Sequence, residues 1–230
     1  MNFTKTGNHR FESLSRIDLF SSLDSDELEL AVEKMTVKSF KRGEVILYEE
    51  DANEFMYIIL DGAVKIIQTT EDGREIVLAI HRSGDFFGEL SLIDGRTSPA
   101  SVVATRNSVT AIISKRDFLS LLYSQHKVLN NLLLILCSRF REAMGVIQML
   151  NFNNAVQRVK MLFVMLCEKY GKEENGMKVL HIKLTHQGIA DMAGMTRETV
   201  TRVLDRWQKD GDITVLKNKL IGLCPDFLGC

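Results

Sequence analysis

The segment 184–204 contains side chains of the types that bind DNA. Four of them fall at the start of a predicted helix, on the side away from its apolar positions: Arg197, Glu198, Thr201 and Arg202. An arginine can pair with two acceptor atoms of guanine, and a glutamate can accept a hydrogen bond from the amino group of cytosine. Because a recognition helix enters the major groove by its N-terminal end, these side chains could contact base edges.

Two predicted helices and a turn would position these side chains. Thr185 is the expected N-cap of a first helix, Gly194 supplies the turn, and Thr196 caps the second helix. The apolar positions of the two helices fall on their inward sides and comprise Ile189, Met192, Ala193, Val200, Val203 and Leu204. This pattern predicts a helix-turn-helix, with Thr185, His186 and Thr196 as further DNA contacts. The alternative is an ordinary helical hairpin with a solvated charged face.

The charge distribution favours DNA binding by the C-terminal part. The 230-residue chain has a net charge of −1; residues 152–230 carry 12 Lys and Arg against 9 Asp and Glu (+3), and the remainder carries 17 against 21 (−4). The basic part is therefore the candidate for contact with a polyanion. We expect a cytoplasmic protein with no membrane segment, because no apolar run approaches the roughly 20 residues of a span and no secretory signal is recognisable.

The four cysteines are too widely spaced for a zinc site or a disulfide framework: Cys137, Cys167, Cys224 and Cys230. We expect reduced thiols, with Cys137 and Cys167 in helix cores. The sequence contains no P-loop, no metal-ligand spacing and no clustered Ser/His/Asp or Cys/His set. We therefore predict no metal site, no catalytic residues and no enzymatic activity.

Residues 37–113 consist of short runs rich in Val, Ile, Tyr and Thr. Their spacing of about ten residues, without helix-length patterns between them, predicts an antiparallel sandwich or barrel. The sequence Glu71-Asp72-Gly73 predicts a hairpin turn within this block. A short helix is expected before it, over 24–34, with Asp24 or Ser25 as the N-cap.

A long amphipathic helix is predicted from about Lys115 to about Leu150. Its apolar stripe steps alternately by four and three residues and consists of Leu129, Leu133, Leu136, Phe140, Ala143, Ile147 and Leu150. Such a stripe faces a partner helix. Leu132, Leu134 and Ile135 are also apolar, so we expect one face to pack on the β-domain and another on a second copy. The alternative is packing on the β-domain alone.

The polar residues 151–154 form the predicted hinge. Beyond the hinge we expect a helix over 155–169, a loop over 171–176 and a short strand over 179–184. The helix-turn-helix then follows.

From about Phe20 to its C-terminus the chain resembles the bacterial regulators of the cyclic-AMP receptor protein and FNR family. The runs KRGEVI, YIILDG and GDFFGE match the family's cyclic-nucleotide-binding β-roll, and LTHQGIADMAGMTRETVTRVL stands where the family has its DNA reader. The resemblance implies an α+β fold with an N-terminal antiparallel β-roll, a long dimerisation helix and a C-terminal winged helix-turn-helix. The implied domains are a sensor over 1–114, the dimerisation helix over 115–151 and a DNA-binding domain over 152–230.

The resemblance implies a homodimer that binds a palindromic double-stranded operator and works with RNA polymerase. Arg197, Glu198 and Arg202 match the family's receptor-type triad, so a TGTGA-like half-site is expected. Allosteric control would pass from an effector in the β-roll to DNA-binding heads that change their arrangement about the hinge. The competing hypothesis is a cyclic-nucleotide-binding regulatory module that acts on a protein partner and has no operator preference.

The effector pocket implied by the family contains residues of the segment 88–101 and of the long helix. The candidates are Phe87, Gly88, Glu89, Leu90, Arg96, Ser98, Pro99, Ala100, Phe140, Ala143 and Met144. In the family's nucleotide binders, Glu89 would hold the ribose hydroxyl, and an arginine followed by Ser or Thr would hold the phosphate. Ser98 and Pro99 take these last two positions, so the neutralising charge is absent. Arg96 is the candidate replacement.

Other features bear on the identity of the effector. Ala143 and Met144 stand where the family's nucleotide binders have hydroxyls that hold the base, which argues further against an unmodified cyclic-AMP pocket. No cysteine precedes Cys137, which argues against an FNR-type iron–sulfur cluster. Haem would need an axial ligand, for which His81 and His126 are candidates.

Two possibilities remain beside cyclic nucleotide and haem. One is an uncharged or apolar effector in a pocket that includes Phe86, Phe87, Phe140, Met144 and Ile147. The other is no effector at all. Glu50, where the family usually has a turn glycine, is a further departure from the standard β-roll.

Overall fold

The computed structural model describes residues 14–73, 75–152, 154–216 and 219–228. The chain divides into two compact units, residues 1–138 and 139–230. Two predictions concern residues outside the described ranges: Asn153 of the predicted hinge and Cys230. None of the helices in the described part of the chain is long and apolar enough to cross a bilayer.

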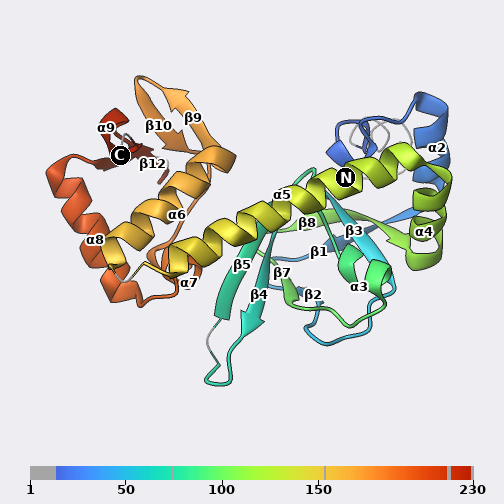
Figure 1. The fold of residues 1–230 in the computed structure, drawn as a ribbon, viewed down its shortest axis with the longest axis horizontal. Helices are drawn as coiled ribbons and strands as arrows, with labels where there is room; N and C mark the ends of the chain where they lie inside the picture. Colours follow the sequence, from blue (N-terminus) through green and yellow to red (C-terminus); the bar gives the residue numbers. More distant parts are fainter. Residues whose placement is uncertain (1–13, 74, 153, 217–218, 229–230) are drawn as a thin grey trace. The chain divides into compact units, whose positions relative to one another are not determined.

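The first unit contains two four-stranded antiparallel sheets, which confirms the predicted β-block (Figure 1). One sheet has the order β1 (Met35–Phe40), β8 (Ser108–Ser114), β3 (Phe55–Asp61) and β6 (Phe86–Phe87). The other has the order β2 (Val45–Leu47), β7 (Ser101–Ala104), β4 (Ala63–Thr69) and β5 (Glu75–Arg82). The predicted hairpin joins β4 to β5, with Thr69 opposite Glu75 and a left-handed Gly73 (φ 79°) between them.

The two sheets and their helices enclose two apolar cores. One lies between strands and helices and contains Met56, Phe86 and Phe118; the other contains Tyr57 and Phe87, whose rings stack with centroids 5.0 Å apart. Because successive strand residues point to opposite faces, Phe86 and Phe87 enter different cores. Phe86 therefore fills the helix-facing core, and its predicted place in an effector pocket is wrong.

Helices cover the first core. The predicted N-terminal helix is α2 (Ser25–Glu33), which follows a short 3-10 helix, η1 (Asp18–Phe20). Asp24 caps α2, and Glu27 donates its backbone N–H to the Asp24 side chain while its own side chain accepts from Asp24. This reciprocal capping box fixes the start of the helix.

The predicted helix over 115–150 is two helices, α4 (Lys115–Ser124) and α5 (His126–Leu150), so that prediction is wrong. Gln125 leaves the helical conformation, with φ −120° and ψ 86°. A continuous helix of this length would extend about 54 Å in a straight line. The bend lets Phe118 of α4 and Val128 of α5 pack in the same core, where both are fully buried.

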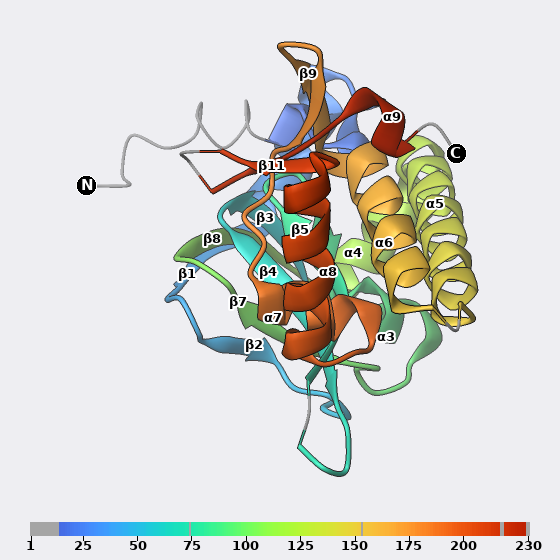
Figure 2. The same cartoon turned by 90° about the vertical axis from the view of Figure 1, so that its left-hand side faces the viewer.

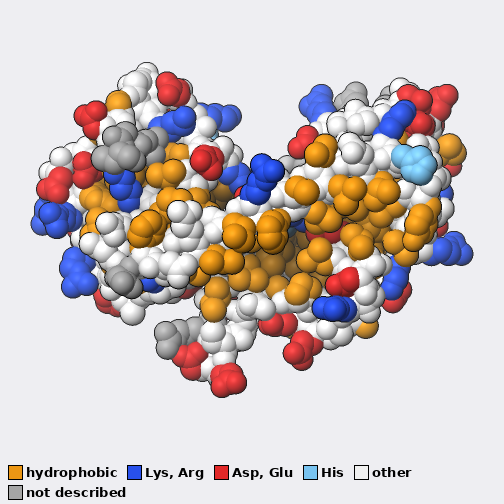
Figure 3. Space-filling model, viewed as in Figure 1, with side chains coloured by type: hydrophobic (Ala, Val, Ile, Leu, Met, Phe, Trp, Pro, Cys, Tyr) orange, Lys and Arg blue, Asp and Glu red, His pale blue; other side chains and the backbone are white. Residues whose placement is uncertain are grey.

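The exposed apolar stripe of α5 differs from the predicted one. Leu129 and Leu136 pack against the first core instead of facing outward. Five exposed residues with steps of four and three form the observed stripe: Leu133, Cys137, Phe140, Met144 and Ile147. Leu134 is exposed beside it, and hydrophobic side chains follow α5 in Figure 3. The expected burial of Cys137 is therefore wrong, because its side of the helix faces away from the core, whereas Cys167 is buried as expected.

The second unit is built around α6 (Ala155–Tyr170), which confirms the helix predicted after residue 154. The predicted loop over 171–176 instead begins with a strand, β9 (Gly171–Glu174), which pairs with β10 (Met177–Leu180). Asn175 (φ 50°) and Gly176 (φ 76°) form a two-residue turn of the kind favoured by hairpins. The strand predicted over 179–184 therefore ends at Leu180.

The remaining elements of the second unit form the helix-turn-helix and its wing. They are α7 (His186–Ala193), α8 (Arg197–Asp210), β11 (Ile213–Val215), β12 (Ile221–Leu223) and α9 (Pro225–Leu228). The four strands pair in the order β11, β12, β10, β9. Figure 2 shows α8 along its length, with α7 near its start and β11 near its end, and both contacts are present in the structure.

Candidate nucleic-acid interface and effector site

Two capped helices build the predicted helix-turn-helix. The Thr185 hydroxyl accepts a hydrogen bond from the backbone N–H of Gly188 (2.9 Å), and the Thr196 hydroxyl accepts from that of Thr199 (3.3 Å). Gly194 ends α7 in the left-handed conformation, with φ 61°. Each cap satisfies a backbone N–H that a helix start leaves without an intrahelical partner. Thr185 and Thr196 therefore position the helices, whatever contact they make with DNA.

The inward side of α8 packs on the rest of the second unit. Val200, Val203 and Leu204 are buried, as predicted, and so is Trp207, which sequence reasoning missed although it continues the same spacing. The Trp207 ring lies 5.9 Å from that of Phe163 on α6, between ring centroids. On α7 the buried residues are Ile189, Ala190 and Ala193, whereas Met192 is only half-buried.

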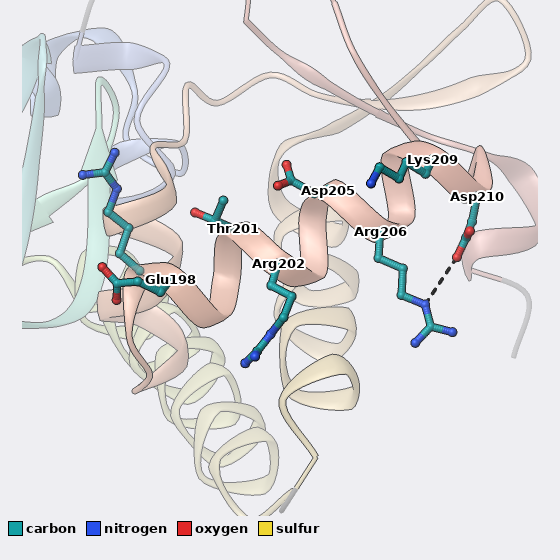
Figure 4. Close-up of a pocket in the computed structure, with 8 residues that line it drawn as sticks. Glu198, Thr201, Arg202, Asp205, Arg206, Lys209 and Asp210 are labelled. Atoms are coloured by element: carbon teal, nitrogen blue, oxygen red, sulfur yellow. Dashed lines mark ion pairs between the residues drawn. The ribbon is translucent and has the colours of Figure 1, made fainter.

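The outward side of α8 carries the predicted base-reading residues. Arg197, Glu198 and Arg202 are exposed and Thr201 is half-buried. They share an open depression with Asp205, Arg206, Lys209 and Asp210 (Figure 4). Arg206 and Asp210 form an ion pair with an N–O distance of 3.5 Å, the dashed line in Figure 4. The structure thus places the four predicted residues together at the N-terminal half of one exposed helix face.

His186 and Thr201 contact each other across the two helices. His186 is the first residue of α7, and its Nδ1 lies 2.8 Å from the Thr201 Oγ1. The sequence predicts both as DNA-binding residues but gives no sign that they pair. The two residues are 15 positions apart in the sequence, so only the packing of the two helices brings them together.

Arg158 of α6 is a further functional candidate that sequence reasoning missed. Its Nε and Nη2 donate to the Phe152 carbonyl at 3.2 and 2.7 Å, and its Nη1 donates to the carbonyls of Ala193 and Gly194 at 3.3 and 3.4 Å. A guanidinium near the end of α7 also complements the partial negative charge there. Arg158 therefore joins the segment after α5 to the turn of the helix-turn-helix.

The candidate effector segment begins at a tightly held glycine. Gly88 has φ 87°, and a Cβ at this position would lie 2.8 Å from the Phe55 carbonyl oxygen, so a larger residue would be strained. The Asn53 amide donates to the Gly88 carbonyl at 2.8 Å. The short helix α3 (Glu89–Asp94) follows; Glu89 is only 3% exposed, whereas Leu90 points to solvent.

The loop after α3 is organised without a cation at the predicted arginine position. Ser98 is buried, and its hydroxyl donates to the Ala100 carbonyl at 2.8 Å. The exposed Pro99 accepts at its carbonyl from the Gln68 amide (3.0 Å), which also lies 3.3 Å from a Glu49 carboxylate oxygen. The nearest charged partner in this hydrogen-bond network is therefore an anion.

Arg96 and the candidate residues on α5 are exposed. The Arg96 side chain is exposed, and its backbone N–H donates to Asp94. Phe140, Ala143 and Met144 are exposed on α5, in the part of the helix that belongs to the second unit. Of the predicted pocket residues, the structure thus brings together those of β6, α3 and the following loop.

The haem candidates and the buried thiol have distinct surroundings. His81 is buried, with its Nδ1 3.8 Å from an Asp85 carboxylate oxygen, and His126 is exposed at the start of α5. Within the described ranges, no three His, Cys, Asp or Glu side chains form a group that could hold a metal ion.

Burial raises the pKa of the Cys167 thiol, and the nearby Lys178 opposes this shift more weakly.

Comparisons with known proteins cover both units. Residues 37–125 match the model of the cyclic nucleotide-binding domain, and residues 157–225 match that of the Crp-like helix-turn-helix domain. The chain is 31% identical over 193 residues to the cyclic AMP receptor protein of Thermus thermophilus, covering 84% of this chain and 86% of that protein. It is 30% identical over 213 residues to the global nitrogen regulator of Synechococcus elongatus, covering 92% and 94%.

A solved structure has the same fold. A CooA variant from Carboxydothermus hydrogenoformans matches with a TM-score of 0.77 at 19% identity, covering 90% of this chain and 89% of that one. At this identity the likeness concerns the fold. Together with the two matched domains, it accounts for the β-roll, the long helix and the helix-turn-helix.

Proposed function

This chain belongs to the CRP/FNR family of transcription regulators, and from that premise we propose that it is a homodimer which binds a palindromic, TGTGA-like operator under allosteric control. The observation that carries the proposal is the exposed face of α8, where Arg197, Glu198 and Arg202 stand together. The proposed functional parts are the sensor over 1–114, the dimerisation helix over 115–151 and the DNA-binding domain over 152–230.

The proposed base contacts follow from the chemistry of these side chains. Each arginine can donate to guanine O6 and N7, and Glu198 can accept from cytosine N4 in the major groove. Their place in the first turns of α8 is where recognition helices meet base edges. A TGTGA half-site offers two guanines on one strand and two cytosines on the other. RNA polymerase is the further partner that family membership suggests.

The proposed dimer forms through α5. Its stripe of Leu133, Cys137, Phe140, Met144 and Ile147 has the four-three spacing of a coiled-coil seam, and Phe140 is 67% exposed in the single chain. Exposed apolar side chains in such a row are unfavourable in water unless a second surface covers them. A second copy of α5 supplies a stripe of the same spacing.

The effector we propose is not cyclic AMP held in the usual way. The buried Ser98 hydroxyl is committed to the Ala100 carbonyl, and Glu49 lies in the same loop network. An uncharged or apolar effector suits these surroundings better than an anion. The names of the two relatives point to different signals, a cyclic nucleotide and nitrogen supply, so similarity at this level does not fix the effector.

DNA binding is tested with labelled duplexes that carry two TGTGA half-sites or a scrambled sequence. Arg202→Ala should weaken binding to the specific duplex by about 10- to 100-fold and relax the preference at one base pair, with little effect on the scrambled duplex. Arg206→Ala is the matched control, because Arg206 lies one turn further along α8 in an ion pair with Asp210.

The results separate the two functional hypotheses. A wild-type protein with no preference between the duplexes would contradict operator binding and would favour the regulatory module with a protein partner. Equal weakening on both duplexes would assign Arg202 to the phosphate backbone. In the same assay, cyclic AMP or cyclic GMP should leave the operator affinity unchanged, and an absorption spectrum of the purified protein tests for haem by its Soret band.

A further inference from the structure

We propose that His186 and Thr201 read DNA as a unit, in which the imidazole sets whether the Thr201 hydroxyl donates to or accepts from a base. Thr201 is the specificity-determining residue and His186 is its positioning residue. The inference rests on the proposed function, since it concerns the same face of α8. It adds a base contact beyond those of Arg197, Glu198 and Arg202. The direction of the hydrogen bond in this contact depends on a residue of α7.

The geometry supports a direct hydrogen bond. His186 Nδ1 and Thr201 Oγ1 are 2.8 Å apart, and both residues are half-buried. Thr201 lies about one turn after Glu198 on the exposed side of α8, and Figure 4 shows it between Glu198 and Asp205. The hydroxyl thus contacts a ring nitrogen of α7, and Thr201 also lines the depression on the exposed face of α8.

The hydroxyl has one proton and two lone pairs to divide between these sides. When the imidazole is neutral with its proton on Nε2, Nδ1 accepts the hydroxyl proton, and Thr201 offers only lone pairs to a base. When the imidazole is protonated, Nδ1 donates to Oγ1, and the hydroxyl proton is free to point to the base. From this tautomer, protonation of His186 therefore frees the Thr201 hydroxyl proton, so that a hydroxyl that could only accept from a base can now donate to one.

The two states select different base edges. An acceptor suits the amino groups of adenine N6 and cytosine N4, whereas a donor suits guanine O6 and N7 or thymine O4. A threonine methyl can contact the thymine methyl in either state, so only the hydroxyl contribution changes. The preferred base at one position should therefore change when the imidazole gains a proton as the pH is lowered.

The charged neighbours of the pair are few and identifiable. On α8 they are Arg197, Glu198 and Asp205, each about one turn from Thr201, with Arg202 adjacent. On α7, Asp191 accepts from Gln187 at 2.6 Å. On α6, Arg158 reaches the opposite end of α7 at Ala193. None of these groups is the hydrogen-bond partner in the 2.8 Å contact, which joins the ring to an uncharged hydroxyl.

The test measures full-length protein by fluorescence anisotropy on operator duplexes in which each base pair of the half-site is varied in turn, at pH 5.5 and 8.0. At one position the wild type should change its preference between amino-bearing and carbonyl-bearing bases by about fivefold, the worth of one hydrogen bond. Thr201→Val keeps the side-chain shape and should abolish the change. His186→Gln can still form a hydrogen bond but does not titrate, so its preference should be independent of pH.

His181→Gln is the matched control, since His181 lies after β10 and contacts Glu174 at 2.6 Å instead of a residue of α8. This variant should keep the wild-type pH response. A wild type that is specific at both pH values with unchanged base preferences would overturn the inference. So would a gain in affinity at pH 5.5 that is equal on all duplexes and survives in Thr201→Val, because His186 would then contact a phosphate. Absence of any specific binding would instead reject the proposed function.

Discussion

At the scale of single residues, Glu50 has a backbone conformation that its side chain does not favour. Its φ is 66°, in the left-handed region, where an L-residue other than glycine pays roughly 1–2 kcal/mol. The Glu50 N–H donates to the Ser98 carbonyl at 2.8 Å, so this strained residue helps to hold the loop that follows α3. The Glu50 conformation is therefore tied to the loop that contains the candidate effector residues Ser98 and Pro99.

We expect Glu50→Gly to increase the free energy of unfolding of the first unit by about 0.5–1 kcal/mol. Glycine removes the left-handed penalty, and its greater freedom in the unfolded chain offsets part of the gain. Urea unfolding followed by far-UV circular dichroism measures the change. Glu54→Gly is the control, because Glu54 is exposed and has no positive φ, and it should be neutral or destabilising. A less stable Glu50→Gly protein would show that the Glu50 side chain itself stabilises the loop.

At the scale of elements, the orientation of α7 depends on a side chain from another helix. Arg158 donates to three carbonyls that belong to the segment after α5 and to the end of α7. The Leu150 side chain at the end of α5 also lies close to Gly194, 3.3 Å from where a Cβ would be. The turn of the helix-turn-helix is thus held from the end of α5 by packing and by hydrogen bonds.

Arg158→Ala should lower the free energy of unfolding of the second unit by about 1.5–3 kcal/mol, because it leaves carbonyl groups without a charged donor. Trp207 is the chain's single tryptophan and is buried in this unit, so its fluorescence in urea reports the transition directly. Arg158→Lys should recover little of the loss, since an ammonium cannot span the same carbonyls with a planar fork. Gln157→Ala, at an exposed position of α6, is the control. Equal stability of Arg158→Ala and wild type would contradict this role.

The stripe on α5 makes Cys137 a direct probe of the dimer. In a parallel pair of α5 helices, equivalent seam residues face each other across the two-fold axis. In a protein that carries Cys224→Ser and Cys230→Ser, mild oxidation should therefore link two chains through Cys137, whereas addition of Cys137→Ser should leave the chains unlinked; Cys167 is buried and does not compete. Non-reducing gel electrophoresis reads the result. If Cys137 instead reacts with a thiol reagent as fast as an exposed thiol and forms no linked dimer, the seam lies elsewhere.

At the scale of the whole molecule, more of the fold could be predicted from caps and turns than from patterns that depend on packing between elements. The caps Thr185 and Thr196 and the turn Gly194 lie within a few residues of what they fix, and the helix-turn-helix followed from them. The bend at Gln125 and the inward position of Leu136 depend on where the first core lies, which a periodic pattern does not encode. The β9–β10 hairpin differs from the predicted loop, although the dipeptide Asn175-Gly176 is itself a strong hairpin signal.

The contact between His186 and Thr201 likewise could not be predicted from the sequence. Each residue type suggests a DNA contact, but their pairing arises from the packing of α7 on α8. The commitment of the Ser98 hydroxyl to a backbone carbonyl is likewise a property of the folded loop. Sequence reasoning could therefore name candidate residues and the serine at the expected arginine position, whereas the hydrogen-bond partners of these residues needed the fold.

The proposed dimer also makes a prediction about operator length. Two recognition helices related by a two-fold axis bind half-sites about one helical turn apart, centre to centre. Insertion of five base pairs between the half-sites turns one of them to the opposite side of the duplex, so only one α8 can bind. Affinity should then fall by on the order of 100-fold, towards that of a duplex with a single half-site, because the second contact is no longer intramolecular. Anisotropy titrations of duplexes with spacers lengthened by zero to ten base pairs measure this dependence, with the single-half-site duplex as the reference. An affinity that does not vary with spacer length would mean that the two heads bind independently, and it would contradict a dimer that presents both copies of α8 in a fixed arrangement.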